Sequence, residues 1–268
     1  MQVVPVSDRG PRGIAFFANM PSLMVKQTRR GCFQEMFGCE AKNEFNISTI
    51  ENPQANILYS LEESSFCCRF IMKNHRASEQ KVWVGNNAGL GDAALVMSAK
   101  KDCTLGLEPC QCCCNPYMNF TDGVGGPMGS VKVPMFCCIP TYKVFDETGQ
   151  PEYEIHQPKC CGGMCVNACA EGCCNCKVPY YIYAPNQEDR GKGMEKGKII
   201  KIWRGMATEF FSDADTFTIN FPADATPEQK ARVLGSTFLL NMMEFEGKPD
   251  RDNGGSLGAP PVEMEITR

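Results

Sequence analysis

Long apolar runs are missing from this 268-residue chain, and so is an excess of positive charge. No stretch of about 18 uncharged apolar residues occurs, which argues against a multi-pass membrane protein. Lysine and arginine number 27 against 31 aspartate and glutamate residues, a net charge of −4. Nucleic-acid-binding domains usually carry a basic excess, so no nucleic-acid partner is expected.

Signatures of covalent chemistry are missing too. The 2 histidines, His75 and His156, belong to no recognisable Ser/His/Asp or Cys/His arrangement, and the phosphate-binding G-x-x-x-x-G-K-[ST] motif does not occur. We therefore expect no enzymatic activity. Residues 1–10 lack the basic and apolar regions of a secretory signal, so the thiols are expected in a reducing compartment.

Cysteine, by contrast, is abundant, with 18 residues. A first cluster comprises Cys110, Cys112, Cys113 and Cys114. Adjacent thiols face different ways in an extended chain and are awkward ligands for one zinc ion. They are suitable for acylation, and two or more acyl chains anchor a protein stably to a membrane. The alternative is that they are small hydrophobic residues in a strand.

A second cluster lies within residues 160–176. Its spacing includes Cys173-x2-Cys176, which is similar to half of a zinc knuckle. A structural zinc site and a second acylated or merely thiol-rich loop both remain open. The members are Cys160, Cys161, Cys165, Cys169, Cys173, Cys174 and Cys176.

Short segments with β character recur from residue 43 onward, separated by turn signals such as Gly125-Gly126-Pro127. In Phe217–Phe221 polar and apolar residues alternate, so Phe217, Ile219 and Phe221 share one face of a strand. About a dozen such strands predict an antiparallel sandwich or barrel. The expected strands are Leu23–Gln27, Asn56–Glu62, Phe66–Met72, Lys81–Val84, Ala93–Ser98, Ser130–Met135, Thr141–Asp146, Glu152–Gln157, Val178–Tyr183, Lys198–Arg204, Ala207–Phe211 and Thr216–Phe221.

One helix is expected near the C-terminus. Thr226, Pro227 and Gln229 form a capping-box pattern, and Lys230–Glu246 follows with apolar residues on nearly every face. Such a helix is buried in a core or inserted in a membrane. Its uncharged stretch, Val233–Met243, is short of the roughly 20 residues that cross a bilayer, which favours the core. The apolar residues are Val233, Leu234, Phe238, Leu239, Leu240, Met242, Met243 and Phe245.

An acidic window precedes this helix. Asp213, Asp215 and Asp224 occupy positions 1, 3 and 12 of twelve residues, as in an EF-hand loop. Positions 5 and 9 are phenylalanine, so the match to an EF-hand is poor. The window predicts either a weak calcium site that uses aspartates and backbone oxygens, or a polar turn that enters a strand.

The order of these motifs resembles that of the phospholipid scramblase family over residues 22–247. The Cys110–Cys114 segment occupies the place of the family's palmitoylated cysteines. The other matching motifs are Gln34-Glu35, Gly38-Cys39-Glu40, Asn43, Glu62-Glu63-Ser64, Cys67-Cys68-Arg69, Arg76, Lys198–Trp203, Glu209–Asp215, Phe221-Pro222, Lys230-Ala231 and Phe238–Glu246.

This resemblance implies a mainly β fold, a closed twelve-stranded antiparallel tubby-like barrel around a central hydrophobic helix. Residues 1–21 would be a flexible lead and residues 248–268 a disordered tail. The family's acidic calcium segment corresponds to Asp213, Asp215, Phe217, Ile219, Phe221 and Asp224.

The implied activity is calcium-dependent, ATP-independent, bidirectional movement of phospholipids between membrane leaflets, without covalent chemistry. Its cofactor would be Ca²⁺ and its partners membrane phospholipids, at the cytoplasmic side of the plasma membrane. A homo-oligomer stays open. One alternative is an acylated, membrane-recruited β-barrel that binds partners or anionic lipid without transport. A second is a zinc-stabilised cytosolic domain that uses the cluster at 160–176.

Overall fold

The computed structural model of the chain describes residues 13–28, 42–65, 72, 75–85, 94–104, 115–136, 139–158, 177–187, 193–202 and 216–245. Within them lie a short 3-10 helix, twelve strands and an 18-residue α-helix. The elements are η2 (Ile14–Phe17), β1 (Ser22–Gln27), β2 (Glu44–Ser48), β3 (Asn56–Glu63), β4 (Ser78–Val84), β5 (Leu95–Lys101), β6 (Tyr117–Asp122), β7 (Pro127–Lys132), β8 (Thr141–Phe145), β9 (Pro151–His156), β10 (Lys177–Tyr183), β11 (Gly197–Ile202), β12 (Thr216–Asn220) and α5 (Pro227–Glu244).

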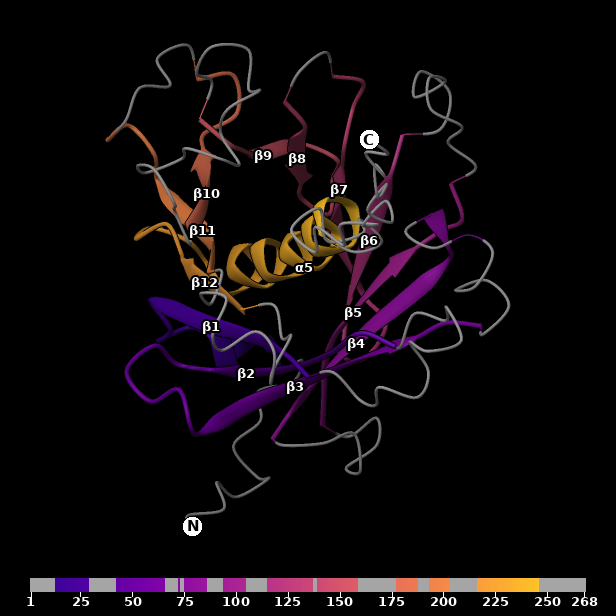
Figure 1. Cartoon of the computed structure of the whole chain (residues 1–268), viewed down its shortest axis with the longest axis vertical. Helices are drawn as coiled ribbons and strands as arrows, with labels where there is room; N and C mark the ends of the chain where they lie inside the picture. The colour runs from indigo at the N-terminus through magenta and orange to yellow at the C-terminus, as the bar shows by residue number, and fades with distance from the viewer. Residues whose placement is uncertain are drawn as a thin grey trace, which may run out of the picture.

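The strands form one closed barrel. Each strand pairs with its neighbours in the sequence, and β12 pairs antiparallel with β1, with Leu23 opposite Ile219. Closure leaves no strand with an exposed edge. Figure 1 shows α5 crossing the inside of this ring of strands. The predicted closed barrel of twelve antiparallel strands around a C-terminal helix is therefore confirmed.

The barrel has two distinct ends. Residue 220 of β12 leads into α5, which then runs through the interior until Phe245 lies 5.7 Å from the ring of Phe217, near the beginning of β12. We call the end where α5 begins the proximal end and the end where it finishes the distal end. Because the strands alternate in direction, the connections between them also alternate between the two ends.

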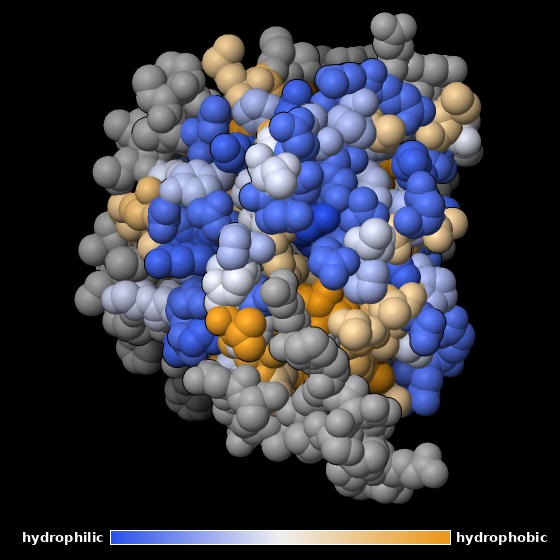
Figure 2. All heavy atoms as spheres, turned by 180° about the vertical axis from the view of Figure 1, so that it is seen from behind, coloured by the Kyte–Doolittle hydropathy of each residue, from blue (hydrophilic) through white to orange (hydrophobic). Residues whose placement is uncertain are grey.

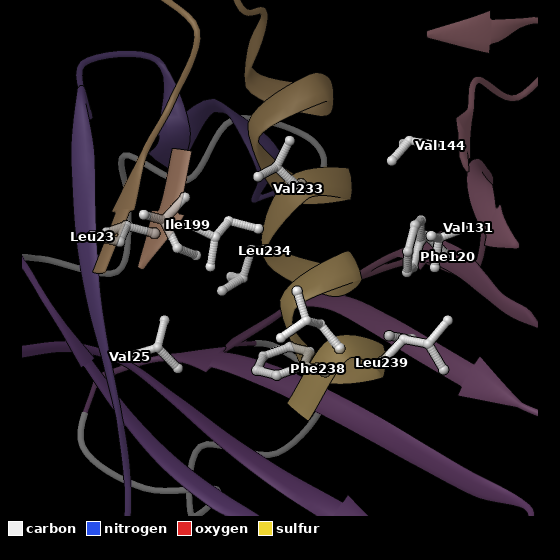
Figure 3. Packing of buried hydrophobic residues seen from close by; sticks show 14 of the residues in the cluster. Leu23, Val25, Phe120, Val131, Val144, Ile199, Val233, Leu234, Phe238 and Leu239 are labelled. Carbon is white, nitrogen blue, oxygen red and sulfur yellow. The ribbon is translucent and has the colours of Figure 1, made fainter. Parts of the chain in front are cut away.

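The core consists of inward-facing strand residues packed around α5 (Figure 3). Phe238 of the helix lies 5.3 Å from the ring of Phe45. Gly235 faces Phe120 so closely that a Cβ atom there would collide with the ring, which explains a glycine in mid-helix. Seen from behind, the described surface is mostly hydrophilic, with hydrophobic residues gathered in the lower part (Figure 2).

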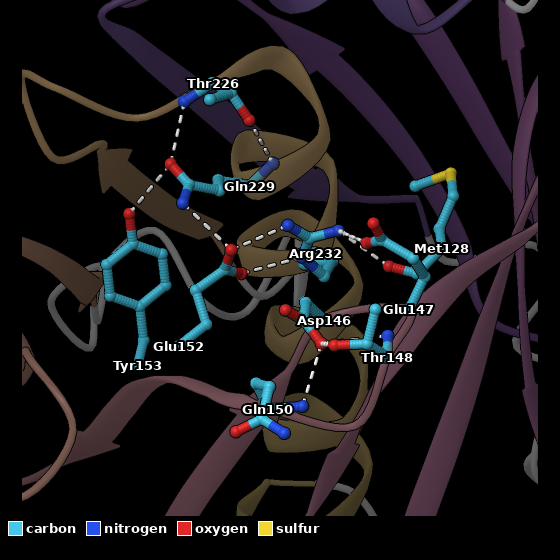
Figure 4. A network of polar contacts seen from close by, with 10 residues as sticks. All are labelled: Met128, Asp146, Glu147, Thr148, Gln150, Glu152, Tyr153, Thr226, Gln229 and Arg232. Atoms are coloured by element: carbon cyan, nitrogen blue, oxygen red, sulfur yellow. Dashed lines mark hydrogen bonds and ion pairs between the residues drawn. The ribbon is translucent and has the colours of Figure 1, made fainter.

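A polar network holds the beginning of α5 against the strands (Figure 4). Arg232 donates two hydrogen bonds of 2.7 Å to the Glu152 carboxylate and a third, also 2.7 Å, to the Met128 carbonyl. Gln229 donates to Glu152 at 2.9 Å. A guanidinium bonded by both of its edges fixes the rotation of the helix as well as its position.

The predicted capping box of α5 is present. The Thr226 hydroxyl accepts a hydrogen bond from the Gln229 N–H at 3.3 Å, and the Gln229 side chain accepts one from the Thr226 N–H at 2.8 Å. Pro227 occupies the first turn, where its missing N–H costs nothing.

Substituting Thr226 with alanine should lower the free energy of unfolding by about 1 kcal/mol, because the first turn loses one cap acceptor. Urea denaturation followed by circular dichroism measures this. Thr226→Ser keeps the hydroxyl and should stay within about 0.5 kcal/mol of the wild type. Equal losses in both variants would show that the hydroxyl does not act as the cap.

The structure differs from expectation at several elements. Strands β2 and β6 were not expected, because Glu44, Asn46, Asn119 and Asp122 disfavour strands by propensity. Their inward residues nevertheless alternate correctly and enter the core. The strands expected at 66–72 and 207–211 lie outside the described residues, apart from Met72.

Residues 13–21 of the expected lead lie within the described part of the chain. Ile14 and Phe17 of η2 are buried in the core, and Lys230 donates hydrogen bonds of 3.1 Å to the carbonyls of Phe17 and Ala18. This segment therefore covers the proximal end of the barrel beside α5. Residues 1–12 and the expected tail at 248–268 lie outside the described residues.

Candidate functional site

Connections between strand ends at the distal end of the barrel contain most of the residues that the sequence analysis singled out. Six connections start and finish there: β1–β2, β3–β4, β5–β6, β7–β8, β9–β10 and β11–β12. The first five of these connections contain all 18 cysteines of the chain, and the sixth contains Asp213 and Asp215. Cys103 is a free, exposed thiol. The predicted acylation residues Cys110, Cys112, Cys113 and Cys114, the cluster at 160–176, Asp213 and Asp215 lie outside the described residues.

The described part of the predicted calcium segment is a wall strand of the barrel. Phe217 and Ile219 have no exposed surface and belong to the core. Strand β12 pairs with β1 on one side and β11 on the other over its whole length. Paired strands use their carbonyls in the two ladders, so Phe217 and Ile219 are poorly suited to bind an ion. Phe221 is buried, and its N–H donates to the Pro21 carbonyl at 3.1 Å.

Asp224 lies at the proximal end, beyond β12. Its carboxylate is exposed and pairs with Lys196 at 3.2 Å, and this hydrogen bond lowers the pKa of Asp224. Thr216, which directly follows Asp215, stands at the distal end of β12, so a five-residue strand of about 16 Å separates the two positions. Asp224 therefore stands at the opposite end of β12 from Thr216, while Asp213 and Asp215 themselves lie outside the described residues. Among the described residues, no group of three or more His, Cys, Asp or Glu side chains is arranged to hold a metal ion.

A buried ion pair lies at the distal end, between the end of β3 and the residues that precede β4. Arg76 and Glu62, both without exposed side-chain surface, form two hydrogen bonds of 2.6 and 2.7 Å. The Asn43 N–H donates to the same carboxylate at 3.1 Å, and Lys101 donates to the Arg76 carbonyl at 2.9 Å. Burial alone raises the pKa of Glu62, but the hydrogen bonds and charge of Arg76, with further hydrogen bonds from Ser64 and Asn43, lower it overall.

A second set of polar contacts lies at the distal end, beside the end of α5. The hydroxyl of Tyr142 donates to Glu244 at 3.2 Å, and Gln157 donates to the Tyr180 hydroxyl at 2.9 Å. Burial, with the nearby Glu244 carboxylate, raises the pKa of both tyrosines well above the ordinary value. These phenols therefore remain neutral in the folded protein throughout the physiological pH range.

Lys201 is an inward-facing lysine of β11, only 2% exposed. Its ammonium lies 3.6 Å from the ring centroid of Phe245 and 6.0 Å from that of Phe217. An aromatic face attracts a cation, and this attraction is stronger where water is excluded. Lys201 therefore helps to hold the end of α5 against the barrel wall.

Comparison with known proteins identifies the family. A family model described as Scramblase matches residues 2–247. The chain belongs to the scramblase family. It is 25% identical to phospholipid scramblase 2 of Bos taurus over 236 residues, which is 88% of this chain and 72% of the relative. It is 26% identical to phospholipid scramblase 1 of Mus musculus over 236 residues, 88% of this chain and 64% of the relative.

Phospholipid scramblase 1 of Homo sapiens is 25% identical over 246 residues, which is 91% of this chain and 70% of that relative. The chain thus spans between 64% and 72% of the length of these relatives. No solved structure matches the chain significantly. In the part of the chain that the structure describes, the closed barrel around one long helix is consistent with the tubby-like fold.

In this scramblase-family chain, three residues that match the family pattern are far apart in the sequence but contact one another in the fold. Asn43, Glu62 and Arg76 were recognised only by their order in the sequence, and the structure joins them directly. Lys101 and Lys201 were missed as members of the distal end. The broken alternation of β11, with Ile200 and Ile202 facing outward and Lys201 inward, was the signal that could have identified Lys201.

The apolar residues of the expected membrane or core helix all belong to α5 or its C-cap. Val233, Leu234, Phe238, Leu239, Leu240 and Met242 are buried, and Met243 and Phe245 are partly buried against the same core. Among the described residues of this scramblase-family chain, no helix is both long and apolar enough to span a bilayer.

Proposed function

We propose that this chain moves phospholipids in both directions between membrane leaflets, without ATP and in response to calcium. The observation that carries the proposal is the match of the Scramblase family model over residues 2–247. The proposed activity breaks and forms no covalent bond. The proposed location is the cytoplasmic side of the plasma membrane, where acyl chains on Cys110, Cys112, Cys113 and Cys114 would anchor the protein.

The packed interior restricts where lipid could pass. Side chains of the strands and α5 fill the described barrel, as the core cluster shows. The lipid path then lies outside this interior, aided by oligomerisation or local thinning of the bilayer, or it opens when α5 leaves the barrel. The proposed calcium ligands are Asp213 and Asp215, because Asp224 stands at the other end of β12.

Reconstitution tests this function directly. The purified chain is incorporated into vesicles with fluorescent phospholipid in both leaflets, and a membrane-impermeant reductant bleaches the outer leaflet. Without ATP, calcium should increase the bleached fraction beyond one half, because lipids from the inner leaflet become accessible. Folded protein that gives no such increase would overturn the proposal.

Aspartate substitutions test the calcium site. Asp213→Asn/Asp215→Asn should abolish the calcium response, because calcium requires hard anionic oxygen ligands. Asp224→Asn, which removes one charge at the proximal end, should retain it. If only the Asp224 variant lost the calcium response, the calcium site would not lie at the distal end.

The enclosed position of α5 favours a second candidate, an acylated barrel that is recruited to the membrane and binds partners without transport. In this case Asp213→Ala/Asp215→Ala leaves membrane recruitment unchanged, and reconstituted protein does not scramble lipid. Substitution of the four cysteines by serine should release the protein from cell membranes under this candidate.

A further inference from the structure

Four exposed lysines lie around the distal end of the barrel. Lys26 is on β1, Lys42 precedes β2, Lys100 is on β5 and Lys132 is on β7. We call these four residues the lysine rim. Within the part of the chain that the structure describes, none of them forms an ion pair; Lys132 lies 5.5 Å from the ring centroid of Phe145.

The acidic residues near the rim have partners of their own. Glu63 pairs with Lys81 at 2.8 Å, and Asp102 accepts a hydrogen bond from the Tyr117 hydroxyl. Glu79 accepts a hydrogen bond from the Ser98 hydroxyl, but this neutral donor leaves its negative charge directly opposite Lys100 in the β4–β5 register.

Like charges meet directly at one point of the rim. Lys132 stands opposite Lys143 in the β7–β8 register. Lys143 pairs with Glu154 at 3.3 Å, which weakens this repulsion, but neither residue opposite Lys132 in its two registers, Tyr117 or Lys143, carries a negative charge. Like charges directly opposite each other destabilise a sheet, so this arrangement suits a surface that meets an anionic partner.

The proximal end has the opposite character. Its exposed charged residues include Glu51, Glu147, Asp224 and Glu228, and its exposed Lys196 is paired with Asp224. Among the described residues, exposed lysines without an ion pair therefore lie at the distal end, whereas the exposed Lys196 of the proximal end is paired. A protein of net charge −4 can approach an anionic surface favourably only in an orientation that presents such an end.

We infer that the distal end is the face that docks on an anionic phospholipid bilayer, with the lysine rim in contact with the acidic headgroups. This inference rests on the proposed membrane function and adds the orientation of the barrel. The cytoplasmic leaflet carries a negative surface potential that attracts basic residues. The connections that contain all 18 cysteines begin and finish at this same end, so acylation within them is compatible with this orientation.

Vesicle binding tests the rim. The unacylated 268-residue chain is sedimented with vesicles of phosphatidylcholine containing phosphatidylserine, or of phosphatidylcholine alone. Lys26→Gln/Lys132→Gln is compared with Lys196→Gln/Lys198→Gln, which removes the same charge at the proximal end. Each rim lysine near the surface contributes about fivefold to partitioning, so the rim pair should weaken binding about 25-fold at low salt. The proximal pair should change it less than twofold.

Further controls make the result specific. Binding should weaken as salt rises and be lost on neutral vesicles, since the attraction is electrostatic. The inference would be overturned if the two charge variants weakened vesicle binding equally or if the rim variant bound as the wild type does. It would also be overturned if the wild type bound equally well with and without phosphatidylserine. Rim-dependent binding to heparin, with vesicle binding unchanged, would instead assign the rim to a soluble polyanion.

The two proposals can fail separately. Calcium-dependent scrambling together with unchanged vesicle binding by the rim variant would overturn the docking face and keep the proposed function. Rim-dependent binding of folded protein that does not scramble lipid would keep the docking face and overturn the transport activity. Thermal unfolding of both charge variants, expected close to the wild type because the substituted side chains lie at the surface, confirms that folding is intact.

Discussion

Replacing Arg76 with methionine should destabilise the protein by about 3–5 kcal/mol, because the variant leaves the Glu62 carboxylate buried without its partner. Both side chains are fully buried, and the pair is bonded at 2.6 and 2.7 Å. Lost hydrogen bonds to a charged group add to the penalty of keeping that charge away from water. Chemical denaturation followed by tryptophan fluorescence measures the change.

The double variant Glu62→Leu/Arg76→Met provides the control. Removing both charges leaves no unpaired ion, so its loss of stability should be smaller than that of Arg76→Met alone. Additive losses would show that the two side chains do not interact energetically. In that case the buried pair would not explain why these residues accompany the family pattern.

The pH dependence of the same variants gives an independent readout. In the wild type the pKa of Glu62 is lowered below the ordinary value of 4.5, so the contribution of the pair is complete above that value and is lost as pH falls through the folded pKa. In Arg76→Met, burial without the partner raises this pKa. The deficit of the variant should therefore shrink as the pH falls from 7 to 5. A deficit that grows over this interval would contradict the proposed role of Arg76.

Substituting Phe238 with alanine should cost about 3–5 kcal/mol, because it leaves a cavity between α5 and the barrel wall. Phe238 is 4% exposed and packs at 5.3 Å against the ring of Phe45. The aromatic pair adds about 0.5–1.5 kcal/mol to the loss of buried area. The thermal midpoint and the urea midpoint should both fall.

Met243→Ala, on the same helix, is the matched control. Met243 is only partly buried against the core, so its truncation should cost less than half as much as that of Phe238. If both substitutions caused the same small loss of stability in detergent-free solution, α5 would not be held inside the barrel under those conditions. The comparison thus measures the position of the helix, on which the lipid path also depends.

Local patterns were sufficient to predict most elements of the fold. The capping box of α5 and the alternation in β12 depend on residues close together in the sequence, and both are present as expected. Strands β2 and β6 were missed because their polar residues disfavour strands locally. Pairing on both sides and burial of Phe45, Ile47, Met118 and Phe120 outweigh that preference in the closed barrel.

The acidic segment shows where sequence spacing misleads. Asp215 and Asp224 are nine positions apart, a distance that a loop can fold around one ion. The structure makes the intervening residues 216–220 a strand of the barrel wall. An extended backbone keeps its ends apart, so the spacing does not by itself place these carboxylates together.

By itself, the sequence determined the strands in which polar and apolar residues alternate, the capped apolar helix and the family. Each of these follows from local periodicity or from the order of the motifs. The tertiary structure decided which of these residues meet. It enclosed α5, joined Asn43, Glu62 and Arg76, separated Asp224 from the distal end, and set the cysteine-bearing connections and the lysine rim at one end. The physical reason is that the register of each strand is set by pairing with both neighbours, up to the β12–β1 pairing that closes the barrel, and such pairings between distant residues are not encoded in any single segment.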